Sequence, residues 1–203
     1  MCVFDWGGGT WDCSICTLSW NEGVTVLATI GSNHNGGEDV DRELTKQALK
    51  KLAQEHDLIL DKPIKEMSSE EYKLHSTLMR EVKTAKEALC NTEKVRGQRK
   101  LWCKFCDIFY SSFSQHTIVL PLGSLGANAT FEHTVTRDNL KDAYGPLLIE
   151  SLFHMSTLFS NTNSAATNMD LLLTGGTSRM YGVREKILSE FPFKVRILPK
   201  FSE

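Results

Sequence analysis

The residues best suited to chemistry lie near the start of the chain, in the stretch VFDWGGGTWDCSI at residues 3–15. The consecutive glycines Gly7–Gly9, followed by Thr10, leave a backbone whose N–H groups can approach a bulky anion such as a phosphate. Asp5 and Asp12 flank them, and two carboxylates beside a phosphate are suitable ligands for hydrated Mg²⁺. The stretch therefore indicates half of a magnesium and phosphate site, although an ordinary hairpin with spare glycines fits it equally well.

These residues must be positioned by strands, because apolar residues alternate with other residues on both sides of the glycines. Residues 2–30 are expected to form three strands of a meander, with Asn21-Glu22-Gly23 as the second turn. The loop that begins at Gly31 then leads into a helix that runs to about His56. Acidic residues in its first turn suit the positive end of the helix dipole.

The middle of the chain indicates a second helix and a small sheet. After Pro63, Ser68 or Ser69 can cap a helix. One face of this helix is expected to hold Tyr72, His75, Leu78, Met79, Val82, Ala85 and Leu89. Residues 91–135 have the pattern of β structure interrupted by turns, and HTIVLPL and ATFEHTV are the better strands.

The pattern becomes helical again from Thr136, and Gly145-Pro146 is expected to split it into two helices. The second of these, PLLIESLFHMSTLF, is strongly apolar and is expected to pack on a sheet. A final strand is expected at residues 194–198, after one more helix.

A second glycine pair follows the apolar run in MDLLLTGGTSRM. This stretch predicts a strand, then Gly175-Gly176, then Thr177 and Ser178 as caps of the helix YGVREKILSEF. A helix N-terminus with unpaired N–H groups behind glycines is a suitable site for an anion. Arg179 adds a planar cation that can stack on a purine ring.

Composition limits the possible functions. The 203 residues are 41% hydrophobic, enough for one sizeable core or two small ones. A net charge of −2 provides no basic surface for nucleic acid. The chain has no apolar run of about 18 residues and no signal region at its start, so a soluble, cytoplasmic protein without membrane contact is expected.

Six cysteines leave two interpretations open. Cys13 and Cys16 form one C-x-x-C pair, and Cys103 and Cys106 form another, with His116 as a spare ligand for zinc. Residues i and i+3 of a strand point to opposite faces, however, which argues against a metal shared by the first pair. Free thiols are the favoured interpretation, and zinc binding by the second pair stays open.

Five motifs in order resemble one known family over nearly the whole chain: FDWGGGTWDCS, NGGEDVDREL, TAKEAL, VTRDNL and LLLTGGTSRM. They resemble the second lobe of the ATPase domain of the 70-kDa heat-shock chaperone family. The resemblance implies an α/β, actin-like (ribonuclease H-like) lobe with a mixed sheet flanked by helices. Residues 1–37 and 134–203 would form its large part, and residues 38–133 an inserted smaller α/β subdomain.

The resemblance also implies roles for individual residues. Asp5 and Asp12 would hold Mg²⁺ through waters and, with Thr10, act in phosphoryl transfer from ATP to water. The residues implied to bind ATP or ADP are Gly7, Gly8, Gly9, Thr10, Gly36, Gly37, Glu38, Lys86, Gly175, Gly176, Thr177 and Arg179. Lys86 would lie near the adenosine, where Lys83, Glu87 and Cys90 depart from the family pattern.

The expected function is therefore one half of an ATP and magnesium site that drives protein folding. The missing first lobe and the peptide-binding domain would be partners, and this chain alone would hydrolyse ATP negligibly. The alternative is a non-catalytic module that docks co-chaperones or nucleotide exchange factors. Charge differences at Lys83 and Glu87 motivate that alternative.

Overall fold

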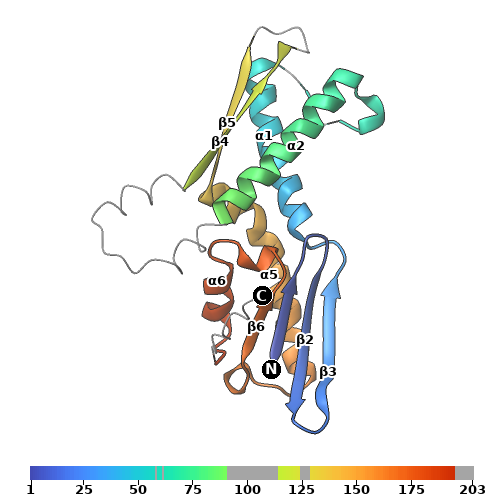
Figure 1. Ribbon diagram of the computed structural model, residues 1–203, viewed down its shortest axis with the longest axis vertical. Coiled ribbons are helices and arrows are strands. Elements are labelled where there is room, and N and C mark those ends of the chain that lie inside the picture. The colour runs from blue at the N-terminus through green and yellow to red at the C-terminus, as the bar shows by residue number, and fades with distance from the viewer. Residues whose placement is uncertain (58, 61, 91–113, 124–128, 195–203) are drawn as a thin grey trace, which may run out of the picture. The chain divides into compact units, whose positions relative to one another are not determined.

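The computed structural model describes residues 1–57, 59–60, 62–90, 114–123 and 129–194 of a mixed α/β protein (Figure 1). The chain divides into two compact units, which are described separately. Unit 1 comprises Met1–Asp39 and Gly145–Glu203, and unit 2 comprises Val40–Tyr144. The assignment of residues 1–37, 134–203 and 38–133 to particular subdomains stays a prediction.

Unit 1 is built on a mixed four-stranded sheet in the order β3-β2-β1-β6. Its strands are β1 (Cys2–Trp6), β2 (Trp11–Ser19), β3 (Gly23–Ser32) and β6 (Leu171–Thr174). The first three pair antiparallel as a meander, and β6 pairs parallel to β1. The predicted meander and its turn are confirmed.

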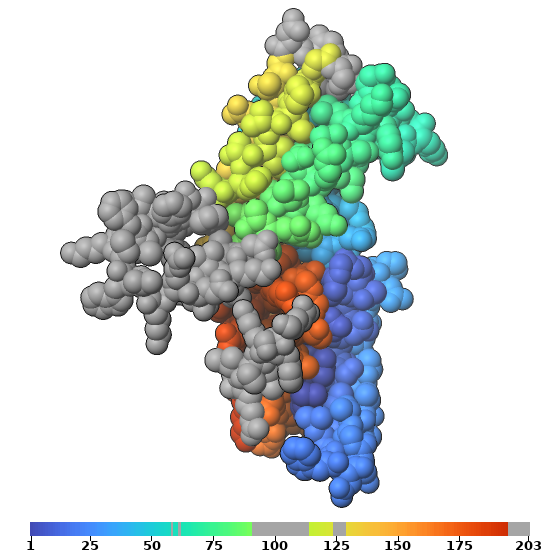
Figure 2. Space-filling view, in the orientation of Figure 1, coloured from blue at the N-terminus to red at the C-terminus, as the bar shows by residue number. Residues whose placement is uncertain are grey.

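One face of this sheet carries the core of unit 1. Phe4, Trp6 and Trp11 are fully buried there, and the Phe4 ring contacts both tryptophan rings edge to face. The Trp11 ring also stacks on His154 of α5 (Arg137–Asn161), which runs behind the sheet in Figure 1. The opposite face of β1–β3, coloured blue, lies open in the space-filling view (Figure 2).

Helix α5 corrects the expectation that Gly145-Pro146 separates two helices, because it continues through Pro146. Proline removes one backbone donor and usually ends or kinks a helix. Buried apolar side chains lie on both sides of it, at Tyr144 and Leu148, and their burial stabilises the helix across the proline. The helix is also less buried than expected, since Ile149 and Phe153 are exposed.

The remaining elements of unit 1 are short. The 3₁₀ turns η3 (Ala166–Asn168) and η4 (Thr177–Arg179) lie on either side of β6. Helix α6 (Val183–Glu190) then ends the described part of the chain, apart from a bridge between Asp170 and Lys194. The rest of the expected strand at 194–198 lies outside the described residues.

Unit 2 contains most of α1 (Gly37–His56), η1 (Ile64–Glu66), α2 (Ser69–Cys90) and a two-stranded antiparallel sheet. The predicted end of α1 and the predicted start of α2 are confirmed. Ser68 caps α2, since its Oγ accepts from the Glu71 N–H at 3.2 Å and the Glu71 carboxylate accepts from the Ser68 N–H at 2.7 Å.

The two strands of unit 2 are β4 (Gln115–Pro121) and β5 (Thr130–Thr136), which confirms both predicted strands. The predicted apolar face of α2 is partly wrong, because Tyr72 and Met79 are exposed and Leu74 is buried instead. The buried residues of α2 are Leu74, Leu78, Val82, Ala85 and Leu89. The β structure expected at 91–113, including Cys103 and Cys106, lies outside the described residues.

Candidate functional site

The two predicted carboxylates lie on one face of the sheet, at the end of the β1–β2 hairpin. Asp5 and Asp12 are direct cross-strand partners, so their side chains leave the same face. Both are exposed, unlike Trp6 and Trp11, the next pair in the register. The sheet therefore places Asp5 and Asp12 opposite each other on its open face, and their role as magnesium ligands stays a prediction.

The carboxylates lean toward opposite neighbouring strands. A Cβ added at Gly175, which follows β6, would lie 2.6 Å from the Asp5 Oδ1 atom. A Cβ added at Gly31 of β3 would meet the Asp12 carboxylate. The Asp5 carboxylate therefore lies beside the residue that follows β6, and the Asp12 carboxylate lies beside β3.

Between these carboxylates, residues 7–10 form the glycine loop, and the carbonyls of Gly7 and Gly8 are turned toward the protein. The Gly7 carbonyl accepts from the Gly37 N–H at 3.0 Å and from the Thr177 hydroxyl at 2.7 Å. The Gly8 carbonyl accepts from the Glu38 N–H at 2.7 Å. In a trans peptide the C=O and the next N–H point in opposite directions, so the N–H groups of Gly8 and Gly9 face away from these partners.

These outward N–H groups are the donors of the loop that could bind an anion. Gly8, Gly9 and Thr10 are exposed, and among the described residues their N–H groups donate no hydrogen bond. The expectation for Gly7 is wrong in one respect. Its N–H donates to the Thr10 carbonyl at 2.9 Å, because that bond closes the turn, so the available donors begin at Gly8.

The segment that leads into α1 packs against the glycine loop. Gly36 lies so close to it that an added Cβ would be 2.6 Å from the Gly9 Cα atom. Since the N–H groups of Gly37 and Glu38 donate to the loop, these residues hold it in place. The Glu38 side chain is exposed.

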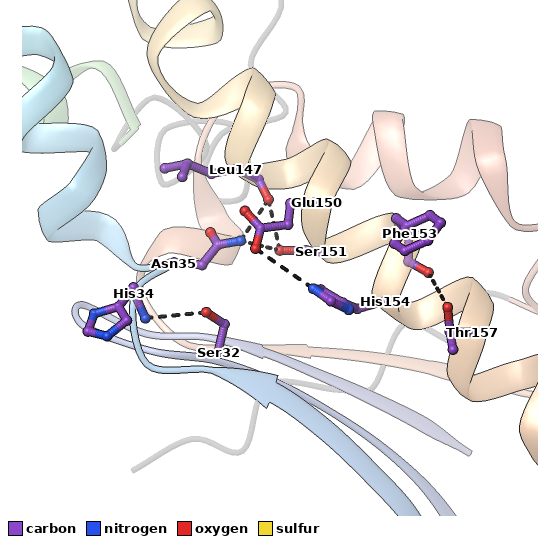
Figure 3. Close-up of polar contacts among 9 residues, drawn as sticks. All are labelled: Ser32, His34, Asn35, Leu147, Glu150, Ser151, Phe153, His154 and Thr157. Atoms are coloured by element: carbon purple, nitrogen blue, oxygen red, sulfur yellow. Dashed lines mark hydrogen bonds and ion pairs between the residues drawn. The ribbon is translucent and has the colours of Figure 1, made fainter.

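Asn35 anchors this segment and was missed by the sequence-based reasoning. Its side chain is buried, and Nδ2 donates to the Leu147 carbonyl at 2.8 Å and to the Ser151 Oγ at 3.0 Å, both on α5 (Figure 3). Its backbone carbonyl accepts from the Trp6 indole N–H at 2.8 Å. The sequence carried no signal for this role, because the burial of Asn35 depends on contacts with α5; its Oδ1 has no hydrogen-bond partner among the described residues.

The second glycine pair is arranged differently from the prediction. Gly175 has a φ of 82°, and η4 follows at once, so α6 begins further along the chain, at Val183. Thr177 and Ser178 do not cap that helix, because their hydroxyls donate to the carbonyls of Gly7 and Gly175. The N-terminus of α6 is therefore not the anion site expected behind these glycines.

Thr177 and Arg179 end up at different depths. Thr177 is buried, and its hydroxyl reaches across to the glycine loop. Arg179 is exposed, in the last position of η4. An exposed guanidinium is a planar cation that can stack on a planar ligand.

Lys86 belongs to unit 2, where it pairs with Asp41, which the sequence indicated only as an acidic residue near the start of α1. Its Nζ lies 2.8 Å from both carboxylate oxygens of Asp41, and the two side chains are nearly buried. Burial raises the pKa of the Asp41 carboxyl, while the hydrogen bond and the charge of Lys86 oppose that shift. Lys83 is exposed on the same helix, and Glu87 is exposed there as well.

The described cysteines are free thiols. Cys2 and Cys13 lie 3.6 Å apart, sulfur to sulfur, in the core of unit 1. The hydrogen bond with Cys2, together with burial, raises the pKa of the Cys13 thiol, which therefore stays protonated. Within the described ranges, no group of three or more histidine, cysteine or acidic side chains could hold a metal ion.

Comparison with known proteins decides the family. A family model described as Hsp70 protein matches residues 1–196 of this chain. The chain belongs to the Hsp70 family. Members of this family are chaperones with an ATP-binding domain, and the mixed α/β architecture agrees with a fragment of that domain.

A curated relative supports the same conclusion. The chaperone protein dnaK of Cyanophora paradoxa is 29% identical to this chain over 197 residues. The match covers 94% of this chain and 27% of that relative, so the chain spans about a quarter of the relative's length. No helix in the described part of the chain is long and apolar enough to cross a membrane.

Proposed function

We propose that this Hsp70 chain supplies one wall of the ATP and Mg²⁺ site of a chaperone ATPase, as the second lobe of an actin-like, ribonuclease H-like domain. The observation that carries the proposal is the glycine loop. Its Gly7 and Gly8 carbonyls are bound to the protein, its N–H groups at Gly8 and Gly9 face outward, and Asp5 and Asp12 flank it. Outward amides beside two carboxylates suit a phosphate with its cation.

Each residue has a defined task in this proposal. The loop amides would bind the β and γ phosphates, and Asp5 and Asp12 would hold the water shell of Mg²⁺. When bound, the cation would neutralise phosphate charge during transfer to water. Gly36, Gly37 and Glu38 would act through the loop that they support, and Arg179 would stack on the base.

One wall does not make a complete site, so the first lobe and the peptide-binding domain are partners in this proposal. Positioning and charge neutralisation supply most of the effect in phosphoryl transfer, and both need groups on each side of the phosphates. The chain alone is therefore expected to hydrolyse ATP negligibly.

A calorimetric titration tests the proposal. Mg–ADP is titrated into this chain joined to an Hsp70 first lobe, and saturable binding is expected. The double variant Asp5→Asn, Asp12→Asn should lose the magnesium dependence of binding. The matched control is Asp138→Asn, because the Asp138 side chain is 89% exposed and lies in unit 2. A blank titration of the unmutated protein would refute the ATPase proposal.

A second candidate is a non-catalytic module that docks co-chaperones or nucleotide exchange factors. One observation favours it, because the ammonium group of Lys86, implied to contact adenosine, is paired with Asp41. If the double variant of Asp5 and Asp12 kept partner binding unchanged and no nucleotide-linked activity were found, the docking function would be supported.

A further inference from the structure

We propose that Thr177 is a positioning residue, which sets the direction of the Gly8 N–H through the Gly7 carbonyl and does not itself contact phosphate. The Thr177 hydroxyl donates to that carbonyl at 2.7 Å, and the residue is 6% exposed. A side chain that is so buried and already donating its proton has little capacity for a second acceptor. The consequence for phosphate binding rests on the proposed function, whereas the effect on the loop does not.

The direction of the Gly7–Gly8 peptide depends on few contacts. Neither residue has a side chain that could oppose rotation of the peptide between them. The Gly7 carbonyl accepts two hydrogen bonds, from the Gly37 N–H and from the Thr177 hydroxyl, which together use both of its lone pairs. Rotation of this peptide would break both bonds and turn the Gly8 N–H into the protein.

The connection after β6 places Thr177 beside the loop. Gly175 adopts a left-handed conformation with φ of 82°, and an added Cβ there would meet the Trp6 carbonyl. The chain therefore folds back over the end of β1, and the first turn of η4 brings Thr177 to Gly7. Ser178 makes a different contact. Its hydroxyl donates to the nearby Gly175 carbonyl at 2.8 Å.

This arrangement distinguishes positioning from direct binding. If Thr177 were a phosphate ligand, removal of its hydroxyl would weaken phosphate binding and leave the ligand-free loop unchanged. If Thr177 positions the loop, the ligand-free loop itself must change. The N–H of Gly8 reports on this directly, because it belongs to the same peptide as the Gly7 carbonyl.

The test uses ¹⁵N-labelled full chain with Thr177→Val, Thr177→Ser and the control Ser178→Ala. Backbone relaxation and the chemical shift of the Gly8 N–H are measured without ligand, and then magnesium pyrophosphate is titrated. Thr177→Val should lower the Gly8 order parameter and weaken pyrophosphate binding by about 3- to 10-fold, the effect of one hydrogen bond. Thr177→Ser keeps the donor and should restore both, and Ser178→Ala should change neither.

The outcomes separate the two proposals. An unchanged Gly8 order parameter and shift in Thr177→Val would overturn the positioning role. If the unmutated chain binds no pyrophosphate, the proposed function loses support, and the ligand-free Gly8 data still decide the role of Thr177. If Thr177→Val does not fold, Thr177→Ala takes its place in the same comparison with Thr177→Ser.

Discussion

Substitution of Gly36 by alanine tests how closely the glycine loop lies on the segment before α1. The added Cβ would meet the Gly8 carbonyl and lie 2.5 Å from the Gly9 carbonyl carbon. Backbone atoms would have to move by about 1 Å to restore ordinary contact. That movement would stretch the hydrogen bonds from Gly37 and Glu38 to the loop, which are 3.0 Å and 2.7 Å long.

The magnitude follows from these contacts. Two weakened hydrogen bonds cost about 1–3 kcal/mol, and overpacking costs about 1–3 kcal/mol more. Gly36→Ala should therefore lower the free energy of unfolding by about 2–6 kcal/mol in urea titrations that follow tryptophan fluorescence. Gly9→Ala is the matched control, because an added Cβ there meets nothing within 4 Å. A loss below about 0.5 kcal/mol for Gly36→Ala would refute the close approach of loop and segment.

Three further predictions concern single residues. Burial, and then the charge of Lys51, lowers the pKa of His133, whose Nε2 has no partner among the described residues. Its protonation therefore favours the unfolded chain, and the free energy of unfolding should fall as the pH drops below about 6.5. His133→Phe should reduce this dependence of stability on pH, as urea titrations at about pH 5 and 7 would measure. Asp41→Asn removes a charged partner of the nearly buried Lys86 and should lower the free energy of unfolding by up to about 3–5 kcal/mol in the same titration. Gly175→Ala should abolish folding of unit 1 or lower its free energy of unfolding by more than about 2 kcal/mol. The reason is that Gly175 has a φ of 82° and that the added Cβ would meet the Trp6 backbone. Circular dichroism during a urea titration would measure this loss.

The sequence predicted the parts of the site that depend on local pattern. Alternating apolar residues indicated the three strands, and the register of β1 and β2 then places Asp5 opposite Asp12. Glycines between two strands indicated an anion site, and the structure leaves the Gly8 and Gly9 amides outward. The role of Gly7 differs because its N–H closes the turn.

Contacts between distant residues could not be predicted in the same way. Thr177 and Gly7 are 170 positions apart, and a threonine after two glycines has the same local pattern whether it caps a helix or reaches another strand. Asn35 bonds to Leu147 on a helix 112 positions away. The helix break expected at Pro146 was also wrong. Burial of apolar side chains on both sides of the proline outweighs the loss of one backbone hydrogen bond.

The most direct test of the central claim is an NMR titration of the ¹⁵N-labelled chain with Mg–ADP at millimolar concentration. The account predicts that the N–H resonances of Gly8, Gly9 and Thr10 shift together, saturably, and that the Asp5→Asn, Asp12→Asn variant loses the magnesium dependence of these shifts. The Gly7 N–H, already bonded to Thr10, should shift least. Resonances of Gly8 to Thr10 that stay in place while others move, or that do not respond at any concentration, would contradict it.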